Sequence, residues 1–312
     1  MTRPPKAPKL PPEEEARLAA EAEAFAASEA DYEFYDADAE ASDPSALGAL
    51  PTGAEAIEML EASADPEKAV EAAAYHKAER RYLGVSVPLI DDLVTLWRAQ
   101  AGDDAAARVA LARDLWASDI HEAMVASAKL LTQARLRPDG EAWDLIASWV
   151  PLFDAWAIAD AVCKAGDRRL VADPSRLDEV EAWIYDENMW ARRATLVMTL
   201  PWTKQRNPSE ADTQIRERVM NWMVILADDR SWFIQKAIAT WLRELSKRDP
   251  ERVQLWLNEH GRSIKKFARI EAGKLLPQPL EDELDDEMDG TEDQVEGDQI
   301  APTQDASDTP KG

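Results

Sequence analysis

The sequence is poor in the residue types that build disulfides and metal centres. Its 312 residues include one cysteine, Cys163, and three histidines that lie far apart, His76, His121 and His260. A single cysteine excludes an intramolecular disulfide and a cysteine-based zinc site. The scattered histidines argue against a histidine-rich metal centre. We therefore expect a protein that works without a metal or another cofactor.

Long apolar runs are also missing. No stretch approaches the roughly 18–20 consecutive apolar residues that a membrane-spanning helix needs. The N-terminal segment, MTRPPKAPKLPPEEE, has no apolar stretch of the kind found in secretory signals. These absences exclude a membrane partner and predict a soluble, cytoplasmic protein, which we expect to be monomeric.

The net charge of −25 argues at first against a polyanionic partner such as DNA. The charge is unevenly distributed, however. Residues 1–66 carry four basic and sixteen acidic side chains, and residues 281–312 carry one basic and thirteen acidic side chains, so each end contributes −12. Residues 67–280 are left with a net charge of −1. Because the acidity belongs to the two ends, the central part remains compatible with nucleic acid.

The same division appears in the apolar residues. All twelve tryptophans lie between Trp97 and Trp256, whereas the ends are rich in proline, alanine and acidic residues. Segments with few apolar residues and dense like charge cannot bury enough surface to fold alone. We predict a mostly disordered extension over residues 1–65, a folded domain over 66–277 and a disordered acidic tail over 278–312. These tails either compete with DNA for the folded domain or keep the protein soluble.

The predicted domain has the apolar spacing of helices throughout. Segments such as DDLVTLWRAQ and WFIQKAIATWLREL place apolar residues at i, i+3, i+4 and i+7, and no stretch alternates convincingly as a strand would. An Asp or Asn N-cap followed by proline, which is a helix-start signal, occurs at Asp65-Pro66, Asp173-Pro174, Asn207-Pro208 and Asp249-Pro250. The pattern predicts an all-α fold of antiparallel helical hairpins.

A weak internal repeat runs through this domain. Aligning a charged residue followed by alanine puts Asp160-Ala161, Arg193-Ala194 and Lys236-Ala237 in register, at intervals of 33 and 43 residues. Such intervals are typical of two-helix solenoid repeats. Stacked repeats of this kind form a superhelix with a concave binding face, so the three positions are expected to line one surface.

Four blocks of the sequence resemble, in order, those of the DNA alkylation repair enzymes, a family of HEAT-like repeat proteins that are DNA glycosylases for alkylated purines. The blocks are Tyr75 with the segment YLGV at 82–85 and Pro88, WAIAD at 156–160, DENMWARRA at 186–194, and FIQKAIATWLRE at 233–244. The resemblance implies a HEAT-like helical-repeat solenoid with a concave DNA-binding face. Its partner would be duplex DNA containing alkylated purines.

The sequence departs from this pattern at two places. Asp91 stands where the family usually has a basic residue. Thr240 occupies the position of a family tryptophan, and Trp241 follows one residue later. Because one residue turns a helix by about 100°, this shift bears on whether the Trp241 ring reaches the same groove.

The resemblance also implies roles for individual residues. Asp160 and Trp156 would be the catalytic residues. Asp160 would stabilise positive charge on the sugar as the base departs, and Trp156, one helical turn before it, would pack against the sugar–phosphate backbone. Arg193 would bind a phosphate through both guanidinium nitrogens. Further DNA contacts would come from Lys236, Trp241, Arg243 and Tyr75.

Each of these residues also has a purely structural interpretation. The alternative for Asp160 is a solvated acid or a salt-bridge partner, and the alternative for Arg193 is a strut that pairs with Asp160 or Asp186. Trp156 and Tyr75 would then be packing residues. We expect His121 to lie at the surface of a helix. The rival to a glycosylase is a non-catalytic relative that binds DNA structures or proteins with the same solenoid, and the Trp241 shift and the near-neutral domain favour it.

Overall fold

The structure is a computed structural model, and it describes residues 48–277. Within this range the chain is all-α, and its β structure is limited to one isolated bridge between Arg81 and Ile120. This confirms the predicted fold class. The helices are α2 (Gly53–Glu61), α3 (Pro66–His76), α4 (Val87–Ala101), α5 (Ala105–Ala117), α6 (His121–Leu130), α7 (Gly140–Trp149), α8 (Trp156–Ala172), α9 (Leu177–Ala182), α10 (Met189–Val197), α11 (Leu200–Lys204), α12 (Glu210–Leu226), α13 (Trp232–Ser246), α14 (Pro250–His260) and α15 (Lys266–Gly273), with short 3₁₀ turns between some of them.

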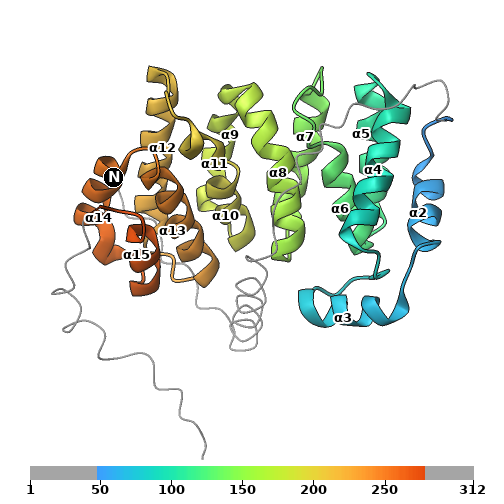
Figure 1. Ribbon diagram of the computed structural model, residues 1–312, viewed down its shortest axis with the longest axis horizontal. Helices are drawn as coiled ribbons and strands as arrows, with labels where there is room; N and C mark the ends of the chain where they lie inside the picture. The colour runs from blue at the N-terminus through green and yellow to red at the C-terminus, as the bar shows by residue number, and fades with distance from the viewer. Residues whose placement is uncertain (1–47, 278–312) are drawn as a thin grey trace, which may run out of the picture. The chain divides into compact units, whose positions relative to one another are not determined.

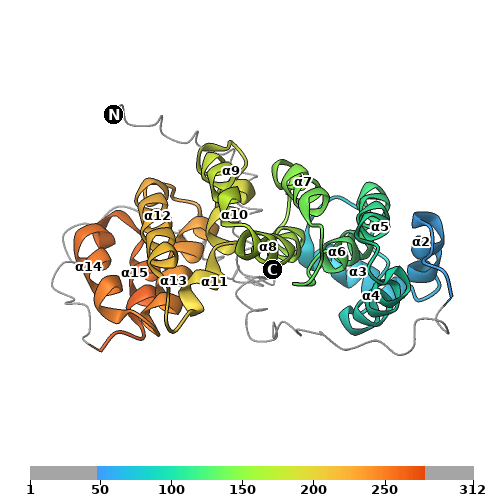
Figure 2. The ribbon, with the colours of Figure 1, turned by 90° about the horizontal axis from the view of Figure 1, so that it is seen from above.

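The order of the helices in space follows their order in the sequence (Figure 1). Helices α6, α8, α10, α13 and α15 pack one against the next, and we call them the central row. Helices α5, α7 and α14 pack against α6, α8 and α13, respectively, on the other side of the apolar core (Figure 2). The core is formed mainly by aliphatic side chains together with several tryptophans, of which Trp97, Trp202, Trp222, Trp241 and Trp256 are fully buried.

The predicted helix starts are mostly confirmed. Asp65 caps α3 and Asp249 caps α14, each through its side chain, and Asp173 caps a 3₁₀ turn that leads into α9. The start predicted at Asn207-Pro208 is wrong by two residues. There α12 begins at Glu210, because Ser209 and Asp212 form a reciprocal capping box that provides a better N-cap.

The predicted domain boundary at residue 66 lies too far along the chain. Helix α2 precedes it, and its residues Ala56 and Leu60 are fully buried. Its start is marked by a capping box in which Thr52 and Glu55 bond each other's backbone amides. The helix is only nine residues long and follows a proline- and acid-rich stretch, so the composition of the region as a whole indicates disorder. The rest of the predicted extension, residues 1–47, and the tail from 278 onward lie outside the described residues.

The glycine of the first sequence block, Gly84, is required by the backbone conformation at this position. Its φ is +76°, and a Cβ atom built there would lie 2.2 Å from the carbonyl oxygen of Asp65. Only glycine therefore fits where the chain passes the start of α3. The adjacent backbone is held by buried Glu122, whose carboxylate accepts hydrogen bonds from the amides of Leu83 and Gly84 at 2.9 and 2.7 Å. This arrangement fixes α3, and with it Tyr75, against the central row.

Candidate active site

Helix α8 carries the predicted catalytic residue in an unusually enclosed setting. Between Trp156 and Leu170 every residue of α8 is buried except Asp160, Lys164 and Arg168. These three residues are spaced by four, so they form one accessible line along the helix, which we call the α8 strip. Asp160 is therefore presented to solvent on the only side of α8 that the neighbouring helices leave uncovered in the described part of the chain.

Asp160 is held by Arg193 of α10. The two guanidinium nitrogens donate to the two carboxylate oxygens, Nη1 to Oδ1 in a very short contact and Nη2 to Oδ2 at 3.3 Å. Arg193 is only 5% exposed, and its guanidinium lies 5.8 Å from the ring centre of Trp190. Asp160 and Arg193, which the 33-residue repeat aligns, are therefore in contact. This is the salt bridge expected if Arg193 acts as a structural strut.

The start of α10 is tied to the loop that precedes α8. Asn188 caps α10 by accepting a hydrogen bond from the amide of Trp190 at 2.9 Å, and its own amide donates to the carbonyls of Pro151 and Phe153 at 3.1 and 2.8 Å. Asp186 in turn accepts from the backbone amide of Asn188 at 2.8 Å. The third sequence block therefore sets the position of Arg193 relative to α8.

Aromatic rings from three elements meet beside the first turn of α8. Tyr75 lies edge-on to Trp156 at 5.8 Å between ring centres, and His76 lies 5.5 Å from the same indole. His76 also stacks on His121 at 4.3 Å, and Tyr82 stacks on His121 at 4.9 Å. Trp156 is only 3% exposed whereas Tyr75 is 36% exposed, so Tyr75 is the ring that the cluster presents to solvent.

The expectation that His121 lies at the surface is wrong, because this first residue of α6 is buried under Tyr82 and His76. No sequence signal indicated the stacked histidine pair, since the two residues are 45 positions apart and belong to different helices. Burial, together with the positive charge of Arg80, lowers the pKa of His76 to about 4. Burial lowers the pKa of His121 as well, with the neighbouring His76 and Arg80 adding to the effect.

These shifts predict acid sensitivity. Because the folded-state pKa values lie below the unfolded value of 6.5, the unfolded chain binds more protons as the pH falls. The contribution of the two histidines to the free energy of unfolding should therefore be complete above pH 6.5 and be lost progressively toward pH 4. His76 alone accounts for up to about 3 kcal/mol of this contribution. Urea unfolding at pH 7.5 and 4.5 measures the loss. His76→Phe should reduce this pH-dependent loss, and an unchanged loss in His76→Phe would contradict the assignment.

The remaining predicted DNA contacts lie on α13. Lys236 is paired with Glu271 of α15, at 2.9 Å to both carboxylate oxygens, and Arg243 donates to the same carboxylate at 2.5 Å. Thr240 lies on the accessible side of α13 together with these two residues, whereas Trp241 is fully buried. The prediction that Trp241 contacts DNA is therefore wrong for this conformation. Because Trp241 lies one residue beyond the position of the family tryptophan, its ring is turned by about 100° around the helix axis and points into the core.

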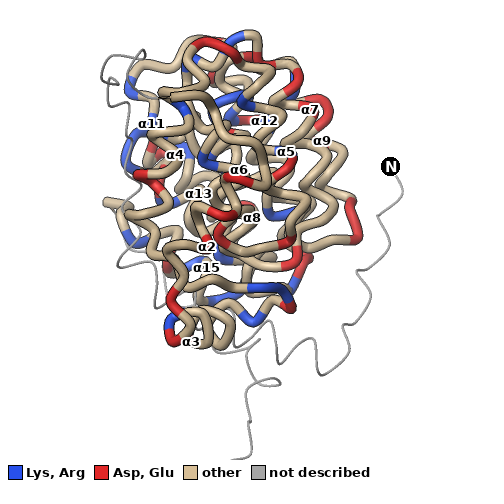
Figure 3. Tube along the Cα trace, turned by 90° about the vertical axis from the view of Figure 1, so that its right-hand side faces the viewer, with Lys and Arg blue, Asp and Glu red and all other residues tan. Residues whose placement is uncertain are grey.

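Asp91, which replaces a basic residue of the family pattern, also has a basic partner. It accepts a hydrogen bond from Lys129 of α6 at 2.6 Å, and Lys129 is the only residue of α6 that is not buried. A basic residue is thus supplied from α6, the first helix of the central row. Acidic and basic residues are interspersed along the described chain, as the near-neutral charge of this region requires (Figure 3).

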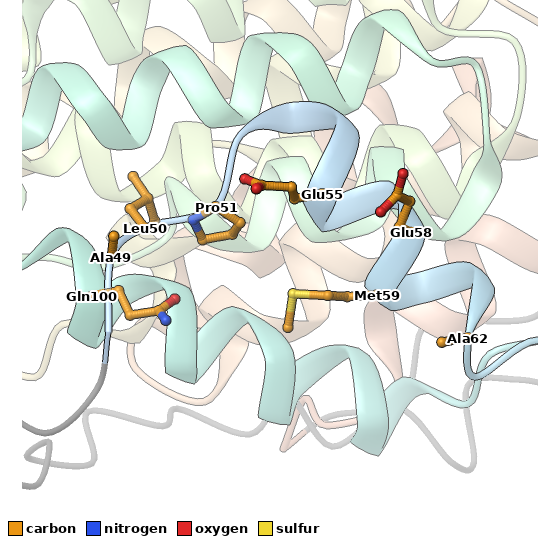
Figure 4. A pocket seen from close by; sticks show the side chains of 8 residues that line it. All are labelled: Ala49, Leu50, Pro51, Glu55, Glu58, Met59, Ala62 and Gln100. Carbon is orange, nitrogen blue, oxygen red and sulfur yellow. The ribbon is translucent and has the colours of Figure 1, made fainter.

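The described residues also form a pocket away from α8. A pocket of about 500 Å³ lies between residues 49–51, α2 and Gln100 of α4, and its lining includes Glu55, Glu58 and Met59 (Figure 4). None of the predicted site residues lines it. Over residues 48–277, no group of three or more His, Cys, Asp or Glu side chains could hold a metal ion. No helix in this range is long and apolar enough to cross a membrane.

A family model for DNA alkylation repair enzymes matches residues 56–276, which is most of the chain. The chain belongs to the DNA alkylation repair enzyme family. This match covers α2 to α15 and confirms the family indicated by the four sequence blocks. Membership assigns the protein a role in the repair of alkylated DNA.

A solved structure has a similar fold. A predicted DNA alkylation repair enzyme from Enterococcus faecalis superposes with a TM-score of 0.58 and 21% sequence identity, covering 70% of this chain and 98% of that one. A Streptococcus mutans UA159 protein, smu.31, is similar at a TM-score of 0.45 and 18% identity, covering 61% and 98% of the two chains. No curated protein matches this DNA alkylation repair family member.

Proposed function

We propose that this protein is a DNA glycosylase that hydrolyses the N-glycosidic bond of cationic N3- or N7-alkylated purines in duplex DNA. The observation that carries the proposal is the position of Asp160, a carboxylate that stands on the single accessible strip of a buried helix. Arg193 holds this carboxylate in a fixed position, and the group is only partly accessible to bulk solvent. A preorganised carboxylate of this kind stabilises developing positive charge.

The chemistry needs little more than this electrostatic help. An alkylated purine already carries a positive charge, so when its bond to the sugar breaks, the electron pair moves to the base and neutralises it. Positive charge then develops on the sugar, where Asp160 opposes it. A water molecule adds to the anomeric carbon, and its proton passes to the carboxylate or to solvent. No metal or other cofactor enters this scheme.

The surrounding residues would position the DNA backbone. In the proposal Arg193 shares its guanidinium between Asp160 and a phosphate, which suits a group with five donors. Tyr75 is the exposed ring beside Trp156, so we assign it the contact with the sugar–phosphate backbone, with Trp156 supporting it from behind. Lys236 and Arg243 would bind phosphates further along the central row, in exchange for Glu271.

A non-catalytic DNA-binding role is the second candidate. Burial of Trp241 favours it, because this removes an aromatic side chain from the surface where the family pattern presents one. Purified full-length protein incubated with methylated duplex DNA separates the two candidates. The glycosylase should release N3- and N7-methylpurines well above the spontaneous rate without added metal. Binding to the duplex with release at the spontaneous rate would overturn the proposal in favour of the second candidate.

A further inference from the structure

The segment that contains α15 is strongly basic, although the domain as a whole is close to neutral. Residues 261–274 carry five basic side chains and one acidic side chain. The acid is Glu271, whose carboxylate is already shared between Lys236 and Arg243 of α13. None of the four family-like sequence blocks includes this segment, since the last block ends at residue 244. The segment therefore carries positive charge that the functional site described above does not use.

Three basic residues flank a stacked pair of aromatic rings at the starts of α13 and α15. The rings of Trp232, the first residue of α13, and Phe267, the second residue of α15, are 6.0 Å apart between centres and inclined by only 15°. Lys265 and Lys266 directly precede Phe267, and Arg230 lies two residues before Trp232. We call Arg230, Lys265 and Lys266 the basic patch. The aromatic pair joins the two short segments that carry it.

The cations of the basic patch have no carboxylate partner within residues 48–277. Two of them, Arg230 and Lys266, are exposed. Asp228 and Asp229 precede α13, but neither forms an ion pair with the patch, and Asp229 pairs with Arg192 of α10 at 2.8 Å. The accessible cations of α6, α8 and α13, in contrast, pair with carboxylates of the protein. An anion that binds the basic patch therefore displaces no carboxylate of the described chain.

The basic patch lies at the same end of the central row as the first turn of α8, which carries the proposed catalytic carboxylate. Asn188, at the start of α10, donates to a carbonyl of the loop before α8. Arg192, one turn later, donates to Asp229 before α13 at 2.9 Å. Gln235, in the first turn of α13, accepts a hydrogen bond from the backbone amide of Lys265 at 2.6 Å. The starts of α8, α10, α13 and α15 therefore follow one another along the row (Figure 1).

The spacing of the row relates the basic patch to the geometry of duplex DNA. Packed helices lie about 8–10 Å apart, so the three steps from α8 to α15 separate the patch from the first turn of α8 by at most about 24–30 Å. One turn of B-DNA is about 34 Å long. A duplex that follows the row, with its damaged nucleotide at Asp160, therefore reaches the patch within its next turn.

We propose that the basic patch binds the phosphate backbone of duplex DNA, within one helical turn of the damaged nucleotide. This inference rests on the proposed function for the position of that nucleotide. The three cations are spread over the starts of two helices, which suits a chain of phosphates better than a single small anion. Because phosphates carry no base information, the patch would strengthen binding to damaged and undamaged DNA alike.

Undamaged duplex DNA tests the basic patch without requiring catalysis. Binding of full-length wild type, Arg230→Gln, Lys266→Gln and their double variant is measured as a function of salt. Arg113→Gln serves as the matched control, since Arg113 is an exposed arginine on α5, outside the central row. Each lost phosphate contact should make the slope of log affinity against log salt shallower by about 0.9. That change makes the loss of affinity between 50 and 200 mM salt about 3–4-fold smaller.

Both single variants should bind the duplex more weakly than wild type at low salt and show the shallower slope, and the double variant should show about twice the change in slope. Arg113→Gln should behave as wild type. If the patch variants differ from wild type no more than Arg113→Gln does, the proposal is wrong. If they keep duplex binding but lose binding to polyglutamate, the patch serves an acidic polypeptide, and the DNA contact is again overturned.

Base release from methylated duplex DNA is scored separately, so the two proposals can fail independently. Release by wild type above the spontaneous rate, with duplex binding unaffected in the patch variants, overturns only the patch. Release at the spontaneous rate, with the expected binding pattern in the patch variants, overturns only the glycosylase and leaves the patch as a DNA contact.

Discussion

Replacing Asp160 by asparagine should lower the rate of base release by about 10²–10³-fold, equivalent to about 3–4 kcal/mol of transition-state stabilisation. Asparagine keeps the size of the side chain and one acceptor for Arg193, but it removes the negative charge that would oppose the sugar cation. DNA binding should be retained or become tighter, because Arg193 loses its intramolecular counter-ion. Single-turnover release of methylated purines, measured beside duplex binding, reports the two quantities separately.

The Asp160–Arg193 pair also supports the fold, so the control must exclude unfolding. Both side chains are largely buried, and breaking such a pair is strongly destabilising. Thermal unfolding of Asp160→Asn therefore sets the temperature at which it is assayed. Glu244→Gln is the matched variant, since Glu244 is a partly accessible carboxylate on α13 that pairs with Lys247. Equal release rates in wild type and Asp160→Asn would remove Asp160 from the mechanism.

Replacing Trp241 by alanine should cost about 3–5 kcal/mol of stability, because the ring is fully buried in the core between α13 and its neighbours. For a domain of this size the melting temperature should fall by roughly 6–20 °C. Once the assay temperature lies below that transition, DNA affinity should equal that of wild type. Thermal unfolding followed by circular dichroism, together with duplex binding, measures both effects.

Thr240→Ala is the natural control, because Thr240 is the adjacent residue on the accessible side of α13. A substitution there should change stability by less than about 0.5 kcal/mol. The opposite pattern, an unchanged melting temperature with weaker DNA binding in Trp241→Ala, would mean that the ring leaves the core to contact DNA. That result would restore the role assigned to it by resemblance.

Much of the fold was accessible from the sequence because its signals are local. Helix-period spacing and Asp-Pro caps identified most of the helices, and the charged-residue repeat placed Asp160 and Arg193 on neighbouring helices of the central row. Helix α2 was missed because its evidence is a capping box and two small buried contacts, which periodicity over a longer window does not detect.

The details of the site depended on contacts that no local pattern encodes. Glu271, which pairs with both Lys236 and Arg243, lies about 30 residues beyond them on the last described helix. The stacking of His76 on His121 joins two helix ends through tertiary packing alone. Counting residues around the helix indicates that the Trp241 ring can point in a different direction from the family tryptophan. Only the packing of α13 shows that the ring lies in the core.

The pairing of five accessible cations of the central row has a kinetic consequence. Lys129, Lys164, Arg168, Lys236 and Arg243 each have a carboxylate neighbour within the protein. If these cations bind DNA as proposed, a phosphate must displace the carboxylate neighbour, so the net free energy of each contact is only the difference between two similar attractions. A repair protein built in this way would hold intact DNA briefly and leave it readily. Fast departure shortens the time spent at each undamaged site and lets a few molecules scan a long chromosome for rare lesions.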